Sequence, residues 1–194
     1  NNREVINMLN TKYFIVSDQN KQPVAQQNPE ANGVGWFVKK IKWVSNANEE
    51  MLALNNFNSK TEAIVDSRFK DLIGELSTQS GTGTLNLIQY DPKHMIYEVN
   101  NMDNKEQLAV FSEIYYSGNK DWKAYIDGEY ADHLRVNYVL RAMMIPSGTH
   151  KVEFIFEPKS YYLGNQISLG FSSILVLLII GTIGMELKNR RLNK

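Results

Sequence analysis

Residues 167–185 read ISLGFSSILVLLIIGTIGM, a run of 19 residues without a charged side chain. At about 1.5 Å per residue such a run forms a helix of roughly 28 Å, close to the ~30 Å hydrocarbon core of a bilayer. A buried core helix of a soluble domain is the alternative, but such helices usually carry a polar stripe. The hydroxyls of its serines and of Thr182 can bond to the helix's own carbonyls. The sequence therefore predicts one transmembrane helix over 167–185.

The residues that flank this run predict its orientation. Basic side chains next to a span are retained on the cytoplasmic side, so residues 186–194 are expected to form a basic cytoplasmic tail, with the topology set by Lys188, Arg190, Arg191 and Lys194. On the other side, Tyr161 and Tyr162 fall where an interfacial aromatic belt lies, within a predicted interfacial linker at 161–166. Everything before the span is then expected outside the cytoplasm, and the lipid bilayer is the first predicted partner.

Composition narrows the function classes. The 194 residues include 21 basic and 21 acidic side chains and no cysteine. A nucleic-acid partner is not expected, because nucleic-acid surfaces need a concentrated basic face and these charges are balanced and scattered. The lack of cysteine excludes disulfides and thiol chemistry. The residues ahead of the span suffice for one domain with a real core or for two small ones.

The start of the chain carries a further expectation. It begins Asn1-Asn2-Arg3, without an initiator Met or an export signal. A domain outside the cytoplasm has to be exported, so we expect the C-terminal piece of a longer polytopic protein, with upstream transmembrane helices as partners. A mature protein whose signal peptide has been removed is the alternative.

Residues 1–76 are predicted to form a mixed α/β extracytoplasmic segment. The patterns indicate a helix over 3–10, a strand over 12–16, a loop over 17–35, a strand over 36–44, a helix over 48–56 capped by Asn46 or Asn48, and a strand over 61–65. Residues 77–84, Ser-Thr-Gln-Ser-Gly-Thr-Gly-Thr, are rich in small side chains and predict a linker. A phosphate-binding loop is disfavoured there, because the Gly-Lys-Ser/Thr ending and a following helix are missing.

Residues 85–160 are predicted to form an antiparallel β-sandwich. Strands are expected over 85–90, 94–99, 107–116, 122–126, 134–145 and 151–156, without helices between them. Asp127-Gly128 is a strong hairpin signal, and Pro146-Ser147-Gly148 marks another turn. The fold class is therefore mainly β (α+β): a β-sandwich ectodomain with a smaller mixed α/β N-terminal part, followed by one C-terminal transmembrane helix.

Few patterns suggest chemistry. The three histidines lack metal-ligand spacing, no nucleophile or metalloprotease motif is present, and nothing pairs the Asp residues near 121–132 as catalytic acids, so we predict no catalytic or metal site. Aromatic side chains can stack against sugars, and the candidate glycan contacts are Trp36, Tyr116, Trp122 and Tyr130. The competing interpretation is that such residues fill the core, because Trp and Tyr are common strand residues.

The β-rich half also resembles a known family. The segments 112–118, 122–128 and 136–158, with a Tyr-Ser-Gly…Trp turn, an Asp-Gly hairpin and a Pro-Ser-Gly-Thr-His-Lys turn, resemble the C-terminal end of the YfhO-like bacterial membrane proteins. The start at 7–13 and Gly35-Trp36-Phe37 look similar to the same family, so the resemblance spans nearly the whole chain. Asn119-Lys120-Asp121 is a short insertion before Trp122 relative to the family pattern.

The resemblance implies a function for a larger protein. Members are large polytopic proteins similar to type C glycosyltransferases, which transfer a sugar from a polyprenyl-phosphate carrier to a cell-envelope acceptor outside the cytoplasm. Their catalytic acid lies in an early loop, so no catalytic residue is carried over and no cofactor is expected in this chain. The chain would supply an accessory ectodomain and the last span, in the plasma membrane, near cell-envelope glycan. The alternative is a non-enzymatic, single-pass anchored β-sandwich that binds glycan or a protein partner.

Overall fold

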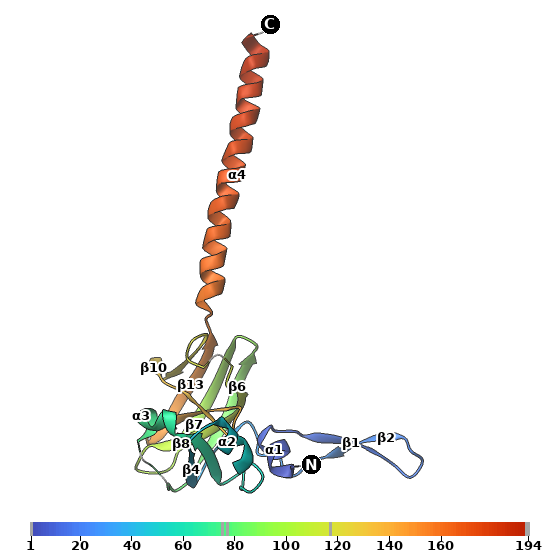
Figure 1. The fold of residues 1–194 in the computed structure, drawn as a ribbon, viewed down its shortest axis with the longest axis vertical. Helices are drawn as coiled ribbons and strands as arrows, with labels where there is room; N and C mark the ends of the chain where they lie inside the picture. The colour runs from blue at the N-terminus through green and yellow to red at the C-terminus, as the bar shows by residue number, and fades with distance from the viewer. Residues whose placement is uncertain (1, 75, 77, 117, 193–194) are drawn as a thin grey trace. The chain divides into compact units, whose positions relative to one another are not determined.

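The computed structural model describes residues 2–74, 76, 78–116 and 118–192 and divides the chain into two compact units. The first, Asn1–Phe156, contains every strand, and the second, Glu157–Lys194, is a single long helix with the short segment that leads into it (Figure 1). The mainly β fold class with one long C-terminal apolar helix is confirmed.

Three short α-helices belong to the β unit: α1 (Arg3–Met8), α2 (Ala47–Ala53) and α3 (Lys70–Ile73), the last preceded by a 3-10 turn at Ser67–Phe69. The Asn2 side chain caps α1 by accepting from the backbone N–H groups of Glu4 and Val5. Asn46 caps α2 in the same way, accepting from Glu49 N at 3.0 Å. These caps satisfy N–H groups that a helix start leaves unpaired, and the predicted cap at Asn46 is confirmed.

The strands form three sheets. A two-stranded ribbon pairs β1 (Tyr13–Ser17) with β2 (Pro23–Gln27). A five-stranded antiparallel sheet has the order β10-β9-β13-β7-β6, comprising β6 (Gly83–Asp91), β7 (His94–Asn101), β9 (Trp122–Ile126), β10 (Glu129–Ala131) and β13 (Gly148–Phe156). A six-stranded sheet has the order β3-β8-β12-β11-β5-β4, comprising β3 (Gly35–Phe37), β4 (Lys40–Val44), β5 (Glu62–Asp66), β8 (Gln107–Ile114), β11 (Leu134–Val136) and β12 (Leu140–Ile145).

The six-stranded sheet is curled. Strands β3 and β4 stand at opposite ends of its strand order, yet β3 ends at Phe37 and β4 begins at Lys40. Two residues reach only a short distance, so the two ends of the sheet must approach each other. The pair β4–β5 is parallel and is joined through α2, as a parallel pair requires a crossover connection. All other strand pairs in the described part of the chain are antiparallel.

Two hydrophobic cores lie on the two faces of this curled sheet. In β8, Leu108 and Val110 pack into a first core, which also contains side chains of the short helices and which we describe as the core that the helices close. Ala109 and Phe111 pack into a second core, which is shared with the five-stranded sheet. Alternate side chains of a strand point to opposite faces, so a strand buried on both faces needs the continuous apolar run that β8 has.

The predicted linker at 77–84 is not a domain boundary. Strands that precede this segment in the sequence and strands that follow it belong to the same six-stranded sheet, and β6 already begins at Gly83. The Gln79 side chain explains why the segment is fixed: its Oε1 accepts from Leu108 N at 2.8 Å, and its Nε2 donates to Val38 O at 2.7 Å. Small residues were needed here for close approach, since a Cβ on Gly83 would lie 2.3 Å from Asn100 O. Ser77 lies outside the described residues.

Other local predictions also need correction. The predicted loop over 17–35 contains β2, which pairs with β1. The predicted strand over 36–44 is the separate pair β3 and β4, and the one over 134–145 breaks at Asn137 and Tyr138, which have φ of 49° and 71°. Buried Glu50 holds that turn, because its Oε1 accepts from Tyr138 N at 2.8 Å. Partners distant in sequence therefore set these breaks. The Asp127-Gly128 hairpin is confirmed, with φ of 52° and 89°.

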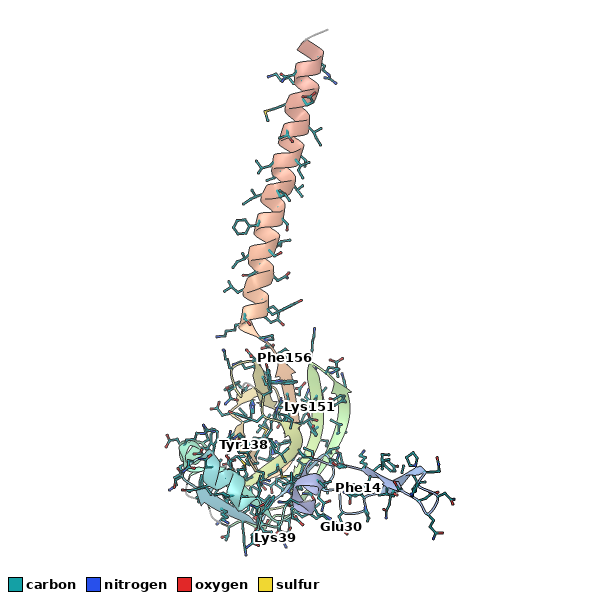
Figure 2. All side chains as sticks on the ribbon, turned by 45° about the vertical axis from the view of Figure 1, so that its right-hand side comes forward. Phe14, Glu30, Lys39, Tyr138, Lys151 and Phe156 are labelled. Atoms are coloured by element: carbon teal, nitrogen blue, oxygen red, sulfur yellow. The ribbon has the colours of Figure 1, made fainter. Side chains whose placement is uncertain are left out.

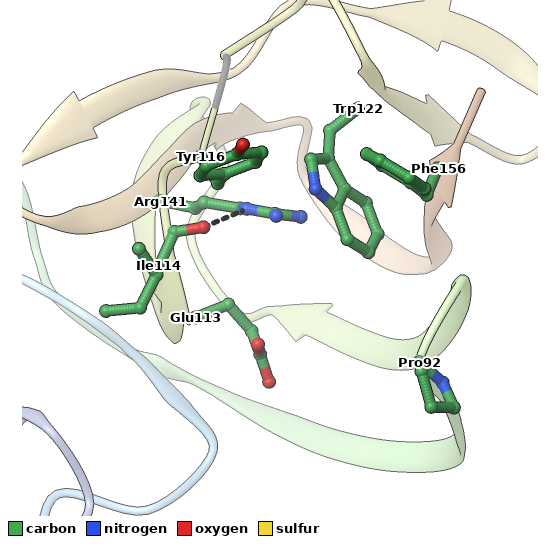
Figure 3. A pocket seen from close by; sticks show the side chains of 7 residues that line it. All are labelled: Pro92, Glu113, Ile114, Tyr116, Trp122, Arg141 and Phe156. Carbon is green, nitrogen blue, oxygen red and sulfur yellow. Dashed lines mark hydrogen bonds between the residues drawn. The ribbon is translucent and has the colours of Figure 1, made fainter. Parts of the chain in front are cut away.

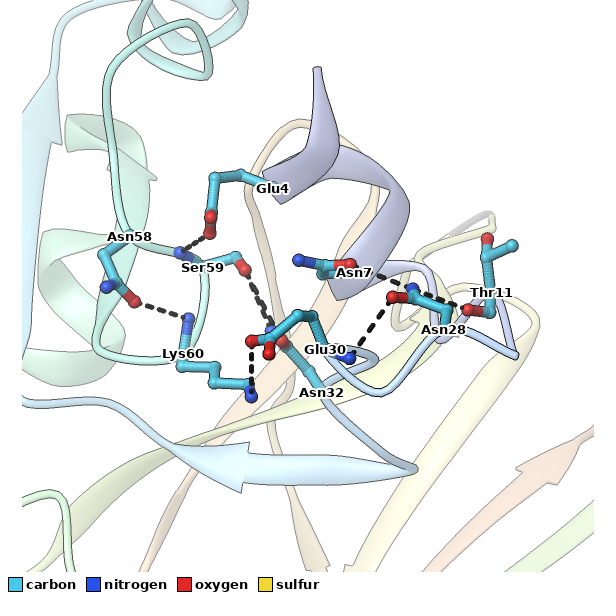
Figure 4. A network of polar contacts seen from close by, with 9 residues as sticks. All are labelled: Glu4, Asn7, Thr11, Asn28, Glu30, Asn32, Asn58, Ser59 and Lys60. Carbon is cyan, nitrogen blue, oxygen red and sulfur yellow. Dashed lines mark hydrogen bonds and ion pairs between the residues drawn. The ribbon is translucent and has the colours of Figure 1, made fainter. Parts of the chain in front are cut away.

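A polar network ties the N-terminal elements to the body of the β unit (Figure 4). Buried Asn28 donates to Asn7 Oδ1 at 3.0 Å and to Thr11 O at 2.9 Å, which joins the base of the ribbon to α1. Ser59 N donates to Glu4 Oε2 at 2.7 Å, which joins the loop before β5 to the same helix. The rest of the ribbon, Tyr13–Ser17 and Pro23–Gln27, is mostly exposed.

The second unit is the helix α4 (Lys159–Leu192), of which the 28 residues Lys159–Glu186 are long and apolar enough to cross a membrane. Within Lys159–Glu186 the side chains are exposed on every face of the helix (Figure 2). Ser173 Oγ donates to Leu169 O and Thr182 Oγ1 to Ile179 O, both at 2.8 Å, as expected of hydroxyls in a membrane helix. Residues 161–166, predicted as a linker, are the first turns of this helix, which also extends through the tail to Leu192.

Candidate ligand-binding pocket

The pocket with the clearest chemical character opens within the β unit and has a volume of about 340 Å³ (Figure 3). Most of its wall is apolar, and Arg141 and Glu113 are its two charged residues. Its lining comes from β8, β9, β12, β13, the β6–β7 turn and the residue pair after β8: Pro92, Glu113, Ile114, Tyr116, Trp122, Arg141 and Phe156.

A β-bulge in the β8–β12 pair positions a polar side chain of the pocket. In the β8–β12 pair, Leu140 lies opposite Ile114 but the next residue, Arg141, lies opposite Phe111, so β8 has additional residues at this point. Such bulges bend a strand and redirect side chains, and they are common next to binding sites. Here the bulge contains Glu113, which contributes its carboxylate to the pocket.

Arg141 is held by its neighbours on three sides. Only 2% of the residue is exposed, and its guanidinium carbon lies 4.0 Å from the ring centroid of Trp122 and 5.2 Å from that of Phe154. Its Nε donates to Ile114 O at 2.9 Å, which fixes the plane of the group. Burial lowers the pKa of Arg141 to about 10, so the side chain is still charged at neutral pH.

Glu113 lies close enough to Arg141 for electrostatic interaction, and no ion pair joins these two described residues. Burial raises the pKa of Glu113, and the charge of Arg141 and a hydrogen bond from Tyr97 oppose that rise. Tyr97 donates through its hydroxyl to Glu113 Oε1 at 3.5 Å, and burial raises the pKa of Tyr97. The pocket thus combines a fixed cation with a carboxylate that has an oxygen free for a ligand.

The structure brings together two of the four residues predicted as glycan contacts. Tyr116 is 64% exposed and Trp122 is 9% exposed, and both line the pocket. Trp122 offers little free ring face, because Arg141 covers one side and Phe156 packs at 5.2 Å between ring centroids. Its role is to hold the guanidinium, while Tyr116 is the ring available for stacking.

The other two predicted contacts lie elsewhere. Trp36 on β3 is partly buried and packs against the core that the helices close. Tyr130 on β10 is 52% exposed, stacks edge-on against Tyr125 and donates to Asp132 Oδ1 at 2.9 Å. Neither lines the pocket. Of the predicted topology residues, Lys188 and Arg191 lie in α4, nothing is described of the Arg190 side chain, and Lys194 is outside the described residues.

Sequence reasoning missed Arg141 and Glu113. The available signal was the single charged residue in the apolar run Val139-Leu140-Arg141-Ala142-Met143, since a charge in a buried strand is rare without a role. In the described part of the chain no group of three or more His, Cys, Asp or Glu side chains could hold a metal.

A strand-rich unit with a lined pocket, joined to a helix that can cross a bilayer, defines a membrane-anchored β protein. The family model described as "Bacterial membrane protein YfhO" matches residues 10–168. Because that match covers most of the chain, the protein belongs to the YfhO family of bacterial membrane proteins, as its motifs indicated. Neither the curated proteins nor the solved structures contain a match to this chain.

Proposed function

We propose that this chain is the extracytoplasmic accessory domain and last membrane span of a larger, type C glycosyltransferase-like protein. In this proposal the parent protein uses a polyprenyl-phosphate-linked sugar for glycosylation of the cell envelope, and its catalytic groups lie in other segments. Membership of the YfhO family and the apolar helix α4 support the membrane part of the proposal.

The observation that supports contact with glycan is the pocket. Sugars present apolar C–H faces, which suit an exposed aromatic ring such as Tyr116, and hydroxyls, which can both donate to Glu113 and accept from Arg141. A pocket of about 340 Å³ is in the size range of small-ligand sites, so one or two sugar units fit it.

Binding is tested on the full chain in detergent micelles. We expect glucose or an N-acetylglucosamine oligomer to change intrinsic tryptophan fluorescence, because Trp122 lies in the pocket wall. Replacing Tyr116→Ala should weaken binding about tenfold, which is ~1.4 kcal/mol. Tyr130→Ala is the matched control, as it removes an exposed tyrosine outside the pocket. Equal loss in both variants, or no binding of any sugar, would contradict the proposal.

Sidedness has a separate test on this chain, whose 194 residues contain no cysteine that a thiol reagent could label. Asn104→Cys places a thiol at an exposed position of the β unit, and Asn189→Cys places one in the C-terminal part of α4. We expect a membrane-impermeant maleimide to label intact cells at 104 and not at 189. The reverse pattern would place the β unit in the cytoplasm.

One observation favours the alternative, a single-pass, non-enzymatic module that binds glycan or a protein partner. The β1–β2 ribbon exposes apolar side chains, including Ile15 at 73% and Tyr13 at 59%, as protein-binding surfaces do. The reading frame ahead of Asn1 separates the two: an array of apolar helices supports the polytopic parent, and a lone signal peptide supports the alternative. In both cases we expect the isolated chain to transfer no sugar.

A further inference from the structure

Arg141 is a buried charge with most of its hydrogen-bonding capacity unused. Its Nε–H is bonded to Ile114 O, but Nη1 is buried without a partner, and among the described residues no Asp or Glu forms an ion pair with this guanidinium. A buried charge is costly unless it is paired and hydrogen-bonded, and unsatisfied buried groups are exceptional in native proteins. The Arg141 side chain can therefore donate hydrogen bonds to a ligand that is not part of the chain.

A buried polar side chain nearby, His133, does not supply that partner. His133 is fully buried against Tyr115 and Phe154, and neither of its ring nitrogens has a hydrogen-bond partner. Burial lowers the pKa of His133 to about 3, and the charge of Arg141 acts in the same direction, so the ring is neutral at physiological pH. A neutral imidazole carries no negative charge to balance Arg141, and its protonated form would be a second cation. Glu113 attracts the guanidinium only from beyond ion-pair distance.

The guanidinium is also fixed before any ligand arrives. Figure 3 shows it against the ring of Trp122, among the residues that line the pocket. A planar guanidinium presents its N–H groups as a rigid fork that matches two oxygens of a carboxylate or phosphate. A neutral hydroxyl would satisfy the hydrogen bonds but leave the charge unbalanced.

We propose that this pocket binds an oxyanion, a carboxylate or phosphate group carried by a sugar, with the Arg141 guanidinium as its main donor. The inference rests on the proposed glycan-binding function and narrows its ligand to acidic glycans. Glu113 restricts the choice further. Its carboxylate repels a bare anion, whereas a sugar hydroxyl placed between the two can donate to it, so the sugar part and the acidic group are recognised together.

The test compares four probes on the full chain in detergent micelles: glucose, glucuronate, glucose 6-phosphate and inorganic phosphate. We expect glucuronate or glucose 6-phosphate, or both, to bind about tenfold more tightly than glucose and than inorganic phosphate. Glucuronate and glucose 6-phosphate separate the carboxylate source from the phosphate source. Arg141→Lys retains the charge but loses the planar fork, and it should abolish the preference for the acidic sugars.

Three controls keep the test decisive. Arg68→Lys changes an exposed arginine outside the pocket and should leave every affinity unchanged. Glu113→Gln removes the repulsion and should tighten binding of inorganic phosphate severalfold. Circular dichroism of each variant reports whether it is folded, and if Arg141→Lys is not, Glu113→Gln alone still tests the electrostatic prediction.

The outcomes separate this inference from the proposed function. Glucose binding as tightly as both acidic sugars would overturn the oxyanion inference and leave the glycan proposal in place. Inorganic phosphate binding as tightly as glucose 6-phosphate, without any glucose binding, would support an oxyanion site and contradict the glycan proposal. Failure of all four probes to bind would contradict both.

Discussion

At the scale of single residues, His133 gives the clearest dependence on pH. In the folded protein burial lowers its pKa from 6.5 to about 3, and the nearby charges of Arg141 and Lys123 act in the same direction. Below pH 6.5 the unfolded chain takes up a proton that the folded chain does not. Acid therefore favours unfolding, by about 1.4 kcal/mol per pH unit from this residue between pH ~6 and ~4.

Substitution isolates this contribution. His133→Phe keeps a ring of similar size against Tyr115 and Phe154 and removes both unpartnered nitrogens. We expect the free energy of unfolding, measured by urea denaturation at pH 7 and at pH 4.5, to fall clearly less with acid in this variant than in the wild type. His94→Gln, a partly exposed histidine bonded to Glu153, serves as the control. Equal acid sensitivity in the wild type and His133→Phe would show that another group dominates.

At the scale of elements, Gln79 takes the place of a strand partner. Its side-chain amide accepts from Leu108 N and donates to Leu108 O at 3.0 Å and to Val38 O, so it completes the pairing where the curled sheet closes. Gln79→Ala leaves Leu108 N and Val38 O without these partners, whereas Leu108 O keeps its bond from Val38 N, and the loss should destabilise the β unit by about 2–3 kcal/mol. Gln79→Glu should cost more, because a carboxylate then faces two carbonyl oxygens. Chemical denaturation measures both.

The exposed Gln89 on β6 provides the matched control, and Gln89→Ala should change stability by no more than about 0.5 kcal/mol. A similar loss in the Gln79 and Gln89 variants would mean that the closure of the sheet does not depend on this amide. Because all three amide contacts reach residues at least 29 positions away, no local pattern around Gln79 could have predicted them.

Features that depend on local sequence were predicted, and features that depend on contacts between distant residues were missed. Strands β7, β9 and β13 and the Asp127-Gly128 hairpin follow from alternation and turn chemistry, which are local. The break at Asn137 depends on its side chain accepting from Ile64 N, a contact across 73 positions. In the pocket, Tyr116 was predicted from its residue type. Arg141 was not, since its importance lies in the ring stacked on it and in the charges that fail to pair with it.

At the scale of the whole molecule, the two units have opposite solvent requirements. The β unit buries its apolar side chains in two cores, whereas α4 exposes residues such as Leu169, Phe171 and Leu177 along its length. Such exposure is unfavourable in water and favourable in hydrocarbon. The exposed apolar surface of α4 is therefore consistent with membership of a family of membrane proteins.

A charge placed in the middle of α4 tests that account. Val176 lies in the apolar stretch of Lys159–Glu186, and Val176→Arg should raise the free energy of membrane insertion by about 3 kcal/mol, since an arginine at the centre of a span is among the costliest substitutions. Val176→Leu is the control of similar bulk. We expect alkaline carbonate to extract a large part of the arginine variant and to leave the wild type and the leucine variant in the membrane pellet. The test uses residues 1–194 expressed without upstream segments, and full retention of Val176→Arg would then show that α4 is not what holds this chain in the bilayer.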